Sequence, residues 1–267
     1  MNFIKIAKES IQYAKVGGYP FQGQTIKFPE GDLESVEVIS PKMGEELLAE
    51  DLTQYELNGD CAYEVINADS FQAARRMENP LVMNFANAHV PGGGFLMGAT
   101  AQEEALCRCS TLYASIHSEK AAEMYRYNNV HLSPVESDYV LLSKNVYVYR
   151  NEKCALLETP FQVGVITIPA PNRRGAALFA SLKTVQDAMT RRIRIMLRIA
   201  AKHGYRELVL GAWGCGAFGN NPEDVAGYFK KVLAEEGYGK CFTKVCFAIY
   251  GKEDGRNITA FREQFLS

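Results

Sequence analysis

The sequence lacks any apolar run close to the ~20 residues that a membrane-spanning helix needs, and charges interrupt its first 15 residues, unlike a secretory signal. It also lacks a Cys-x-x-Cys motif. Its seven cysteines follow no framework pattern, and its four histidines are scattered. These absences argue against a disulfide scaffold and a structural zinc site. We expect a cytoplasmic protein with reduced cysteines, no metal and no membrane partner.

Charge of either sign is not in excess. The 29 lysines and arginines nearly balance 31 aspartates and glutamates, so no overall field attracts nucleic acid or an anionic membrane. With 267 residues, 47% of them apolar and 22% charged, the chain has an ordinary globular composition and room for one large or two small domains. We expect no sequence-specific binding of nucleic acid.

The first 58 residues have their own pattern of elements. Helical periodicity predicts helices at residues 3–15 and 41–57, and the extended stretch between them holds a strand at residues 36–40. We interpret residues 1–58 as an N-terminal, mainly helical extension that packs on a main domain spanning residues 59–267.

From Cys61 onward, apolar strands alternate with amphipathic helices. The expected strands cover residues 62–68, 81–85, 163–170, 207–213 and 244–251. The expected helices cover residues 70–78, 101–116, 176–203 and 256–266, with one more starting at Pro222. Residues 118–137 look irregular, and residues 140–151 form a hairpin or two short strands. This alternation predicts an α/β domain with helices on both faces of its sheet.

The predicted helix at residues 176–203 carries a run of basic side chains. They are Arg191, Arg192, Arg194, Arg198 and Lys202. We interpret this run as a solvated helix face; the alternative is that it attracts a long anionic substrate.

The stretch from residue 81 to residue 116 carries the strongest functional signal. An apolar strand leads into a loop with three consecutive glycines, Gly92-Gly93-Gly94, and then into a helix whose first turn holds Gln102-Glu103-Glu104. Glycines permit close backbone approach to a ligand, and a helix N-terminus offers free N–H donors. Two neighbouring acids beside such a loop suit a small anionic or sugar-bearing ligand.

Each of these features alone has an ordinary structural explanation. Acidic residues in a first helical turn complement the helix dipole, and a glycine-rich loop is a weak signal. Their occurrence only seven residues apart is much harder to explain by structure alone.

A second glycine loop follows the strand at residues 207–213. Residues 211–219 contain four glycines together with Trp213 and Phe218, more than a tight strand-to-helix turn needs. Ligands of α/β sheets bind at loops beyond the carboxyl ends of the strands. We therefore predict one cleft built from residues 84–104 and 211–219.

The motif GGG, seven residues and then QEE resembles the signature of the poly(ADP-ribose) glycohydrolases, and its surroundings, NFANAHVPGGGFLMGATAQEEALCRCSTLY, resemble the microbial-type branch of that family. The segments ITIPAPN (166–172) and LGAWGCGAFGNNPEDVA (210–226) extend the resemblance over most of residues 60–265. It implies a three-layer α/β/α macrodomain with a mixed central sheet. It also implies hydrolysis of ribose–ribose O-glycosidic bonds in poly(ADP-ribose), releasing ADP-ribose.

The resemblance also implies roles for individual residues. Glu104 would be the catalytic general acid and base, as glycosidic cleavage requires, and Glu103 would hold the terminal ribose through its hydroxyls. The implied substrate-binding residues are Asn87, Gly92, Gly93, Gly94, Gln102, Gly214, Cys215, Gly216, Ala217, Phe218, Gly219 and, at the adenine, Asp69.

Other functions stay open at this point. The chain could bind ADP-ribose without turnover, or remove ADP-ribose from a protein side chain or a nucleobase with the same glutamate. A dehydrogenase is disfavoured, because no G-x-G-x-x-G with a following acidic residue closes the first strand, so we expect no cofactor. The expected partner is poly(ADP-ribose) or an ADP-ribosylated macromolecule.

Overall fold

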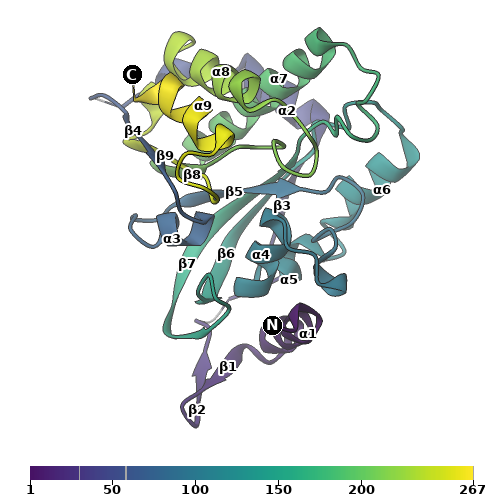
Figure 1. The fold of residues 1–267 in the computed structure, drawn as a ribbon, viewed down its shortest axis with the longest axis vertical. Coiled ribbons are helices and arrows are strands. Elements are labelled where there is room, and N and C mark those ends of the chain that lie inside the picture. The colour runs from purple at the N-terminus through teal and green to yellow at the C-terminus, as the bar shows by residue number, and fades with distance from the viewer. Residues whose placement is uncertain (30, 58, 267) are drawn as a thin grey trace.

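The computed structural model describes residues 1–29, 31–57 and 59–266, and a seven-stranded mixed sheet lies at its centre (Figure 1). Its strands are β3 (Glu37–Ile39), β4 (Ala62–Ile66), β5 (Leu81–Ala86), β6 (Val140–Arg150), β7 (Leu156–Pro169), β8 (Glu207–Leu210) and β9 (Lys244–Ala248). Their order across the sheet is β3-β6-β7-β5-β8-β9-β4. The five strands from β7 to β4 run parallel, whereas β6 is antiparallel to both of its neighbours.

Helices cover both faces of this sheet (Figure 1). One layer contains α2 (Pro41–Ala49), α7 (Leu182–Lys202), α8 (Pro222–Lys230) and α9 (Arg256–Phe265). The other contains α1 (Phe3–Val16), α3 (Ser70–Ala74), α4 (Gln102–Cys109), α5 (Leu112–Ile116) and α6 (Ala122–Val130). Each layer packs its own apolar core against the sheet, which confirms the predicted three-layer α/β/α fold.

Local sequence signals account for several of these elements. The central strands β5 and β7 are apolar runs because both of their faces are covered. The start of α8 follows the predicted cap: the Asn221 side chain accepts hydrogen bonds from the N–H groups of Glu223 and Asp224, and Pro222 occupies the first turn. Within the described residues, no helix is both long and apolar enough to cross a bilayer.

The single helix predicted at residues 101–116 is two helices, α4 and α5. Between them Ser110 is extended, with φ −145°, and forms a β-bridge with Val148 of β6. The next residue, Thr111, donates its N–H to the carbonyl of Tyr147 and accepts the Tyr147 N–H on its side chain. This pairing with β6 ends α4 although the apolar spacing continues.

Other predicted boundaries also change. The supposed hairpin at residues 140–151 is one long strand, β6, which forms its hairpin with β7. The stretch expected to be irregular contains α6. The helices predicted at residues 41–57, 70–78 and 176–203 are shorter, and the first is followed by a 3-10 turn at Leu52–Tyr55. The chain also contains 3-10 turns at Phe95–Met97 and Tyr238–Cys241 and a π turn at Lys231–Glu235.

The basic run on α7 is a solvated face only in part: Arg192 and Arg198 are buried, whereas Lys202 is exposed. Arg192 is fully buried and donates through Nε to Asp138 at 2.8 Å, while Arg191 donates to the other oxygen of the same carboxylate. The Arg194 guanidinium pairs with Glu236, at 2.6 Å from Nε. These ion pairs tie α7 to the segments around it.

The first 58 residues contribute to two parts of the molecule. The hairpin of β1 (Gly18–Phe21) and β2 (Gln24–Lys27) extends away from the main sheet beside α1 (Figure 1). In contrast, β3 pairs with β6 at the sheet edge, and α2 packs on α7. The proposed boundary at residue 58 stays a prediction.

Candidate active site

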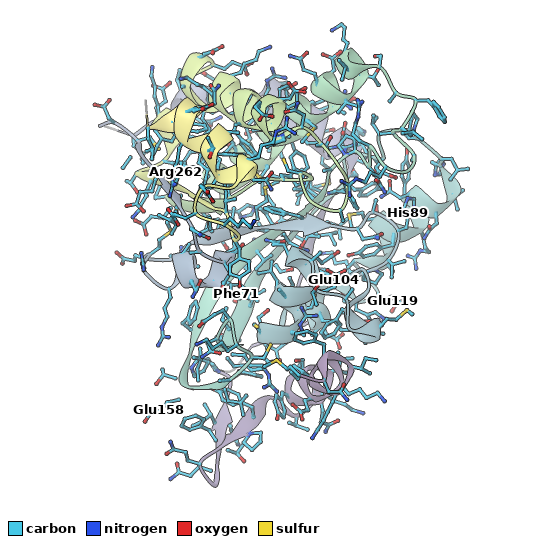
Figure 2. All side chains as sticks on the ribbon, in the orientation of Figure 1. Phe71, His89, Glu104, Glu119, Glu158 and Arg262 are labelled. Carbon is cyan, nitrogen blue, oxygen red and sulfur yellow. The ribbon has the colours of Figure 1, made fainter. Side chains whose placement is uncertain are left out.

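A cavity of about 730 Å³ opens where the parallel strands end. The segments that follow β4, β5, β7, β8 and β9 all contribute to its wall, together with the first turn of α4. In Figure 2, Glu104 lies where α4 meets the central sheet. The predicted site residues that line the cavity are Asp69, Asn87, Gln102, Glu103, Glu104, Gly214, Gly216, Ala217 and Phe218. Residues from both predicted segments, 84–104 and 211–219, thus meet at one cleft.

Glu103 is buried and surrounded by protein donors. Its Oε2 accepts the backbone N–H of Asn87 at 2.8 Å, and its Oε1 accepts the side-chain amide of Asn84 at 3.3 Å. The backbone N–H of Gly92 adds another hydrogen bond. Burial raises the pKa of Glu103 to about 8, and the nearby charge of Glu104 adds to the increase. Burial thus favours the protonated form of Glu103, against the three hydrogen-bond donors that favour the ionised form.

Glu104 is also buried but is bonded on one side only. Its Oε1 accepts the backbone N–H of Gly94 at 2.9 Å, whereas its Oε2 is buried without a hydrogen-bond partner. A buried carboxylate oxygen without a donor is costly unless a ligand or water completes it. Glu104 lines the cavity, so a group bound there lies next to this carboxyl group.

The first glycine loop holds these carboxylates and does not itself line the cavity. A Cβ on Gly93 would lie 2.5 Å from Glu104 Oε1, and Gly93 has a left-handed φ of +55°. A Cβ on Gly94 would lie 2.7 Å from the Ala99 side chain. Gly92, Gly93 and Gly94 are absent from the residues that form the cavity wall. Because these three residues have no side chains, the backbone of the loop packs closely against the first turn of α4.

Gln102 anchors the start of α4 to the sheet and to α3. Its side-chain oxygen accepts the Phe85 N–H at 2.9 Å, and its amide nitrogen donates to the Met83 carbonyl at 2.8 Å and to Ser70. Both the oxygen and the nitrogen of the Gln102 side chain are therefore hydrogen-bonded to the protein. The residue positions the two acids that follow it.

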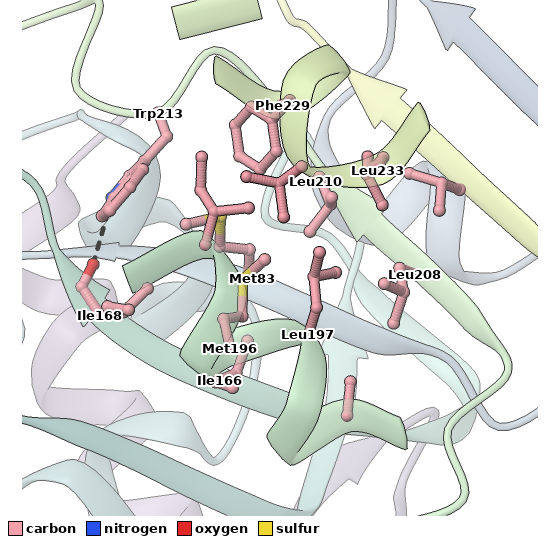
Figure 3. Close-up of a cluster of buried hydrophobic side chains, with 14 of the residues drawn as sticks. Met83, Ile166, Ile168, Met196, Leu197, Leu208, Leu210, Trp213, Phe229 and Leu233 are labelled. Atoms are coloured by element: carbon pink, nitrogen blue, oxygen red, sulfur yellow. Dashed lines mark hydrogen bonds between the residues drawn. The ribbon is translucent and has the colours of Figure 1, made fainter. Parts of the chain in front are cut away.

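The second glycine loop forms the opposite wall. Trp213 is fully buried, and its indole N–H donates to the carbonyl of Ile168 at the end of β7, which fixes the loop on the core (Figure 3). The side-chain amide of Asn220 donates to the carbonyls of Pro171 and Gly214 and closes the loop. Cys215 and Gly219, also predicted here, are not part of the cavity wall.

Asp69 lines the cavity and caps the N-terminus of α3. Its Oδ1 accepts the N–H groups of Phe71 and Gln72 at 2.8 and 3.0 Å, and its Oδ2 is buried without a partner. Burial raises the pKa of Asp69. Tyr250, after β9, and Asn257, in α9, line the same region.

The sequence analysis missed several of these residues. Asn84 was read as part of an apolar strand, yet it is fully buried and holds Glu103 and Thr167. The signal was present, because an asparagine inside the run LVMNFA needs buried partners. Tyr250 could have been found from the rule that ligands bind beyond strand carboxyl ends.

Asn87 uses part of its side chain for the loop itself. Its Oδ1 accepts the N–H groups of His89 and Val90 at 2.8 and 3.0 Å. Its backbone N–H holds Glu103, as described above. Among the described residues, no cluster of three or more His, Cys, Asp or Glu side chains could hold a metal ion.

The comparisons with known proteins bear on this site. A family model described as microbial-type PARG, catalytic domain, where PARG is poly(ADP-ribose) glycohydrolase, matches residues 7–151, which include the first glycine loop and both glutamates. The chain is 33% identical to the crystallised PARG of Thermomonospora curvata, with a TM-score of 0.89 over 98% of this chain and 99% of that chain. A search of curated proteins found no match.

Two ligand-bound structures are also similar. The same Thermomonospora curvata enzyme bound to the inhibitor ADP-HPD is 33% identical, with a TM-score of 0.88 and coverage of 98% of this chain and 99% of that chain. PARG from Deinococcus radiodurans in complex with ADP-ribose is 37% identical, with a TM-score of 0.80, covering 86% of this chain and 93% of that chain.

Proposed function

The chain belongs to the microbial-type poly(ADP-ribose) glycohydrolase family, and on that premise we propose that it hydrolyses the ribose–ribose O-glycosidic bonds of poly(ADP-ribose), with Glu104 as general acid and base. The released product is ADP-ribose. One observation carries the assignment of Glu104. Protein donors hold both oxygens of Glu103, whereas Glu104 keeps one buried oxygen without a partner at the cavity.

The shape of the cavity supports one orientation of the terminal ADP-ribose unit. The distal ribose lies against Glu103 and Glu104, which sit together in the first turn of α4. The diphosphate lies along the second glycine loop, where Gly216 has no neighbouring atom within 4 Å of its Cβ position and leaves room for a ligand. The adenine lies at the end bounded by Asp69 and Tyr250.

The chemistry follows from the free oxygen of Glu104. Its carboxyl gives a proton to the leaving ribose oxygen as the glycosidic bond breaks, and the terminal ribose passes through an oxocarbenium-like state. The carboxylate then takes a proton from the water that attacks the anomeric carbon, which restores the acid. The substrate's own diphosphate supplies negative charge near the cationic ribose.

Glu103 supports this chemistry by position and by charge. Burial raises the pKa of Glu103 to about 8, which favours an uncharged side chain next to Glu104. Its hydrogen bonds to Asn84 and Asn87 hold it against the sheet, where its edge at the cavity can meet the hydroxyls of the distal ribose.

We assign the α/β/α domain to the macrodomain class on the same resemblance. All seven cysteines are free, which supports a reducing, cytoplasmic compartment. The balanced charge of the chain, −2, supports recognition of poly(ADP-ribose) or of an ADP-ribosylated macromolecule through the cavity and not through a general attraction to nucleic acid.

The direct test is incubation with purified poly(ADP-ribose) and quantification of released ADP-ribose. The wild-type protein should release ADP-ribose. Glu104→Gln should lower the rate by about 10² to 10⁴, the usual contribution of a positioned acid–base group, while ADP-ribose binding stays within a few-fold of wild type. A fully active Glu104→Gln protein would remove Glu104 from the proposed role.

A substrate panel separates the proposed activity from its alternatives. Release of ADP-ribose from a mono-ADP-ribosylated protein or nucleobase, with no cleavage of polymer, would contradict the proposed substrate. Calorimetric binding of ADP-ribose with no turnover of any of these substrates would indicate a binding protein. Phe179→Ser, a change at a 95% exposed side chain outside the cavity wall, is a control that should leave both readouts unchanged.

A further inference from the structure

Part of the cavity wall is made of residues to which the proposed hydrolysis assigns no role. This part lies between α4 and the turn joining β6 to β7, and its wall includes Arg108, Cys109, Val148, Arg150, Cys154 and Phe161. Figure 1 shows the β6–β7 hairpin running past α4 toward α1. Two thiols and two guanidinium groups meet here.

The two thiols come from separate elements and lie in the same part of the cavity wall. Cys109 is the last residue of α4, and Cys154 lies in the β6–β7 turn with a left-handed φ of +57°. Both residues approach one carbonyl oxygen: the backbone N–H of Cys154 donates to the carbonyl of Asn151 at 2.8 Å. The Cys109 thiol also lies 3.4 Å from the carbonyl oxygen of Asn151, which accepts its proton.

Positive charge surrounds Cys154 in particular. The Arg108 guanidinium donates a hydrogen bond to its side chain, and Arg150 Nη1 donates to its carbonyl at 2.8 Å. Arg150 is buried and its Nε has no partner. The neighbouring Cys109 side chain, followed by the charges of Arg108 and Arg150, lowers the pKa of Cys154 to about 6.

The other cysteines have no such surroundings. Burial raises the pKa values of the Cys61, Cys107 and Cys246 thiols. Among them, Cys107 belongs to the same helix as Cys109, two residues earlier, and lies outside the cavity wall. Cys154 therefore differs from these cysteines in its neighbours, one thiol and two guanidinium groups.

We propose that Cys154 is an oxidation site for small hydroperoxides, with Cys109 as its resolving thiol, and that the resulting disulfide lowers glycohydrolase activity. In the first step the Cys154 thiolate attacks the hydroperoxide O–O bond and becomes a sulfenic acid, and the hydroperoxide leaves as an alcohol or water. In the second step Cys109 attacks the Cys154 sulfur, and water leaves as the disulfide forms. The hydroperoxide supplies both oxidising equivalents.

The link to activity is α4 itself. Its last residue is Cys109, and its first turn carries Glu103 and Glu104. A disulfide needs an S–S separation of about 2.05 Å, shorter than any thiol hydrogen bond, so its formation must draw the end of α4 and the β6–β7 turn together. A displacement of about 1 Å at a catalytic group is enough to reduce turnover severely.

The test combines alkylation with peptide mapping of the full-length protein. The rate of Cys154 alkylation by iodoacetamide should reach half of its plateau near pH 6, whereas ordinary thiols titrate near pH ~8.5. Cys109→Ala should move that midpoint upward, because alanine removes the polar group beside Cys154. Cys61→Ser, a change at a partly exposed thiol away from the cavity, should leave the midpoint unchanged.

Peroxide treatment provides the second readout. Mass spectrometry should find a Cys109–Cys154 linked peptide in the wild-type protein, and a dimedone-trapped sulfenic acid on Cys154 in Cys109→Ser. Alkylation of Cys61 or Cys246 before Cys154, or no linked peptide after peroxide, would overturn the proposed site. Neither measurement depends on glycohydrolase activity, so the result stands apart from the proposed function.

Activity tests the regulatory part of the proposal. Peroxide-treated wild type should lose at least about tenfold of its rate relative to the untreated protein, and dithiothreitol should restore it. Cys154→Ser, compared with its own untreated sample, should show no such loss. An oxidised protein that carries the disulfide but keeps its full rate would overturn the link between this site and the active site.

Discussion

The two glycine loops near the active site resemble each other in sequence but have different structural roles. In the first loop the missing Cβ of Gly93 makes room for the protein, because that atom would lie 2.5 Å from the Glu104 carboxylate. In the second loop the missing Cβ of Gly216 leaves space for a ligand, since no atom beyond its chain neighbours lies within 4 Å of the Cβ position.

The difference shows what glycine spacing alone does not reveal. A glycine-rich loop marks a close approach, but the approaching group can be a side chain of the protein or a ligand. Here the first loop fixes the acids and the second faces the cavity. We therefore expect changes in the first loop to disturb the folded protein and changes in the second to disturb binding.

The largest effect is expected for Gly93→Ala. The new methyl group would collide with Glu104, and the left-handed φ of +55° is unfavourable for alanine. Together we expect a loss of about 2–4 kcal/mol in the free energy of unfolding, and a fall of about 100-fold in polymer hydrolysis as Glu104 moves. Urea denaturation and the hydrolysis assay check both values.

Gly204→Ala separates the two causes. Gly204 has a similar φ of +75°, but nothing lies within 4 Å of its Cβ position and it is not part of the cavity wall. Gly204→Ala should lower the free energy of unfolding by about 1–2 kcal/mol, the cost of the left-handed φ alone, and should leave hydrolysis unchanged. Equal losses of activity in Gly93→Ala and Gly204→Ala would contradict the role given to the first loop.

The next effect concerns the acid that the first loop encloses. The unfolded protein releases the Glu103 proton above pH 4.5, whereas the folded protein retains it until about pH 8. Between these values the folded state binds more protons, so the free energy of unfolding falls as pH rises and then levels off. The total change is on the order of a few kcal/mol, at about 1.4 kcal/mol per pKa unit.

Glu103→Gln removes this dependence, because glutamine resembles the protonated acid and does not titrate. The difference between the wild-type and Glu103→Gln unfolding free energies, measured by denaturation from pH 4.5 to pH 8, should therefore decline as pH rises. A flat or rising difference would mean that Glu103 is ionised in the folded protein.

A smaller effect is expected for Gly216→Ala in the second loop. Its methyl group meets nothing in the ligand-free protein, so the unfolding free energy should stay the same. The group would take up space proposed for the diphosphate, and ADP-ribose affinity should fall by about 1–3 kcal/mol. Isothermal calorimetry measures this loss, and unchanged affinity would place the diphosphate elsewhere.

The smallest effect is expected far from both loops. Gly227 lies inside α8 with nothing within 4 Å of its Cβ position. Gly227→Ala should raise the unfolding free energy by about 0.5–1 kcal/mol and leave hydrolysis and binding unchanged. This variant shows by thermal denaturation how a glycine behaves when neither protein nor ligand needs its space.

Features that depend on neighbouring residues along the chain were predictable. The start of α8 at Asn221-Pro222 and the apolar strand β5 follow from caps and runs that are visible locally. The meeting of residues from segments 84–104 and 211–219 at one cleft also followed, because strand carboxyl ends share an edge in a parallel sheet.

Features set by distant partners were not predictable. The break at Ser110 depends on its bridge to Val148, and the burial of Arg192 depends on Asp138, more than fifty residues away in the sequence. The unequal bonding of Glu103 and Glu104 depends on which backbone N–H groups fold back onto them. Side-chain pattern carries no information about such contacts before the chain is folded.

The central claim is that the free oxygen of Glu104 meets the distal ribose while the second loop receives the diphosphate. A crystal structure of this protein with ADP-ribose tests it most directly. We expect Glu104 Oε2 within about 2.6–3.2 Å of the hydroxyl on the anomeric carbon, and the diphosphate against Gly216. A distal ribose bound away from Glu104, with Oε2 still unpartnered, would contradict the account.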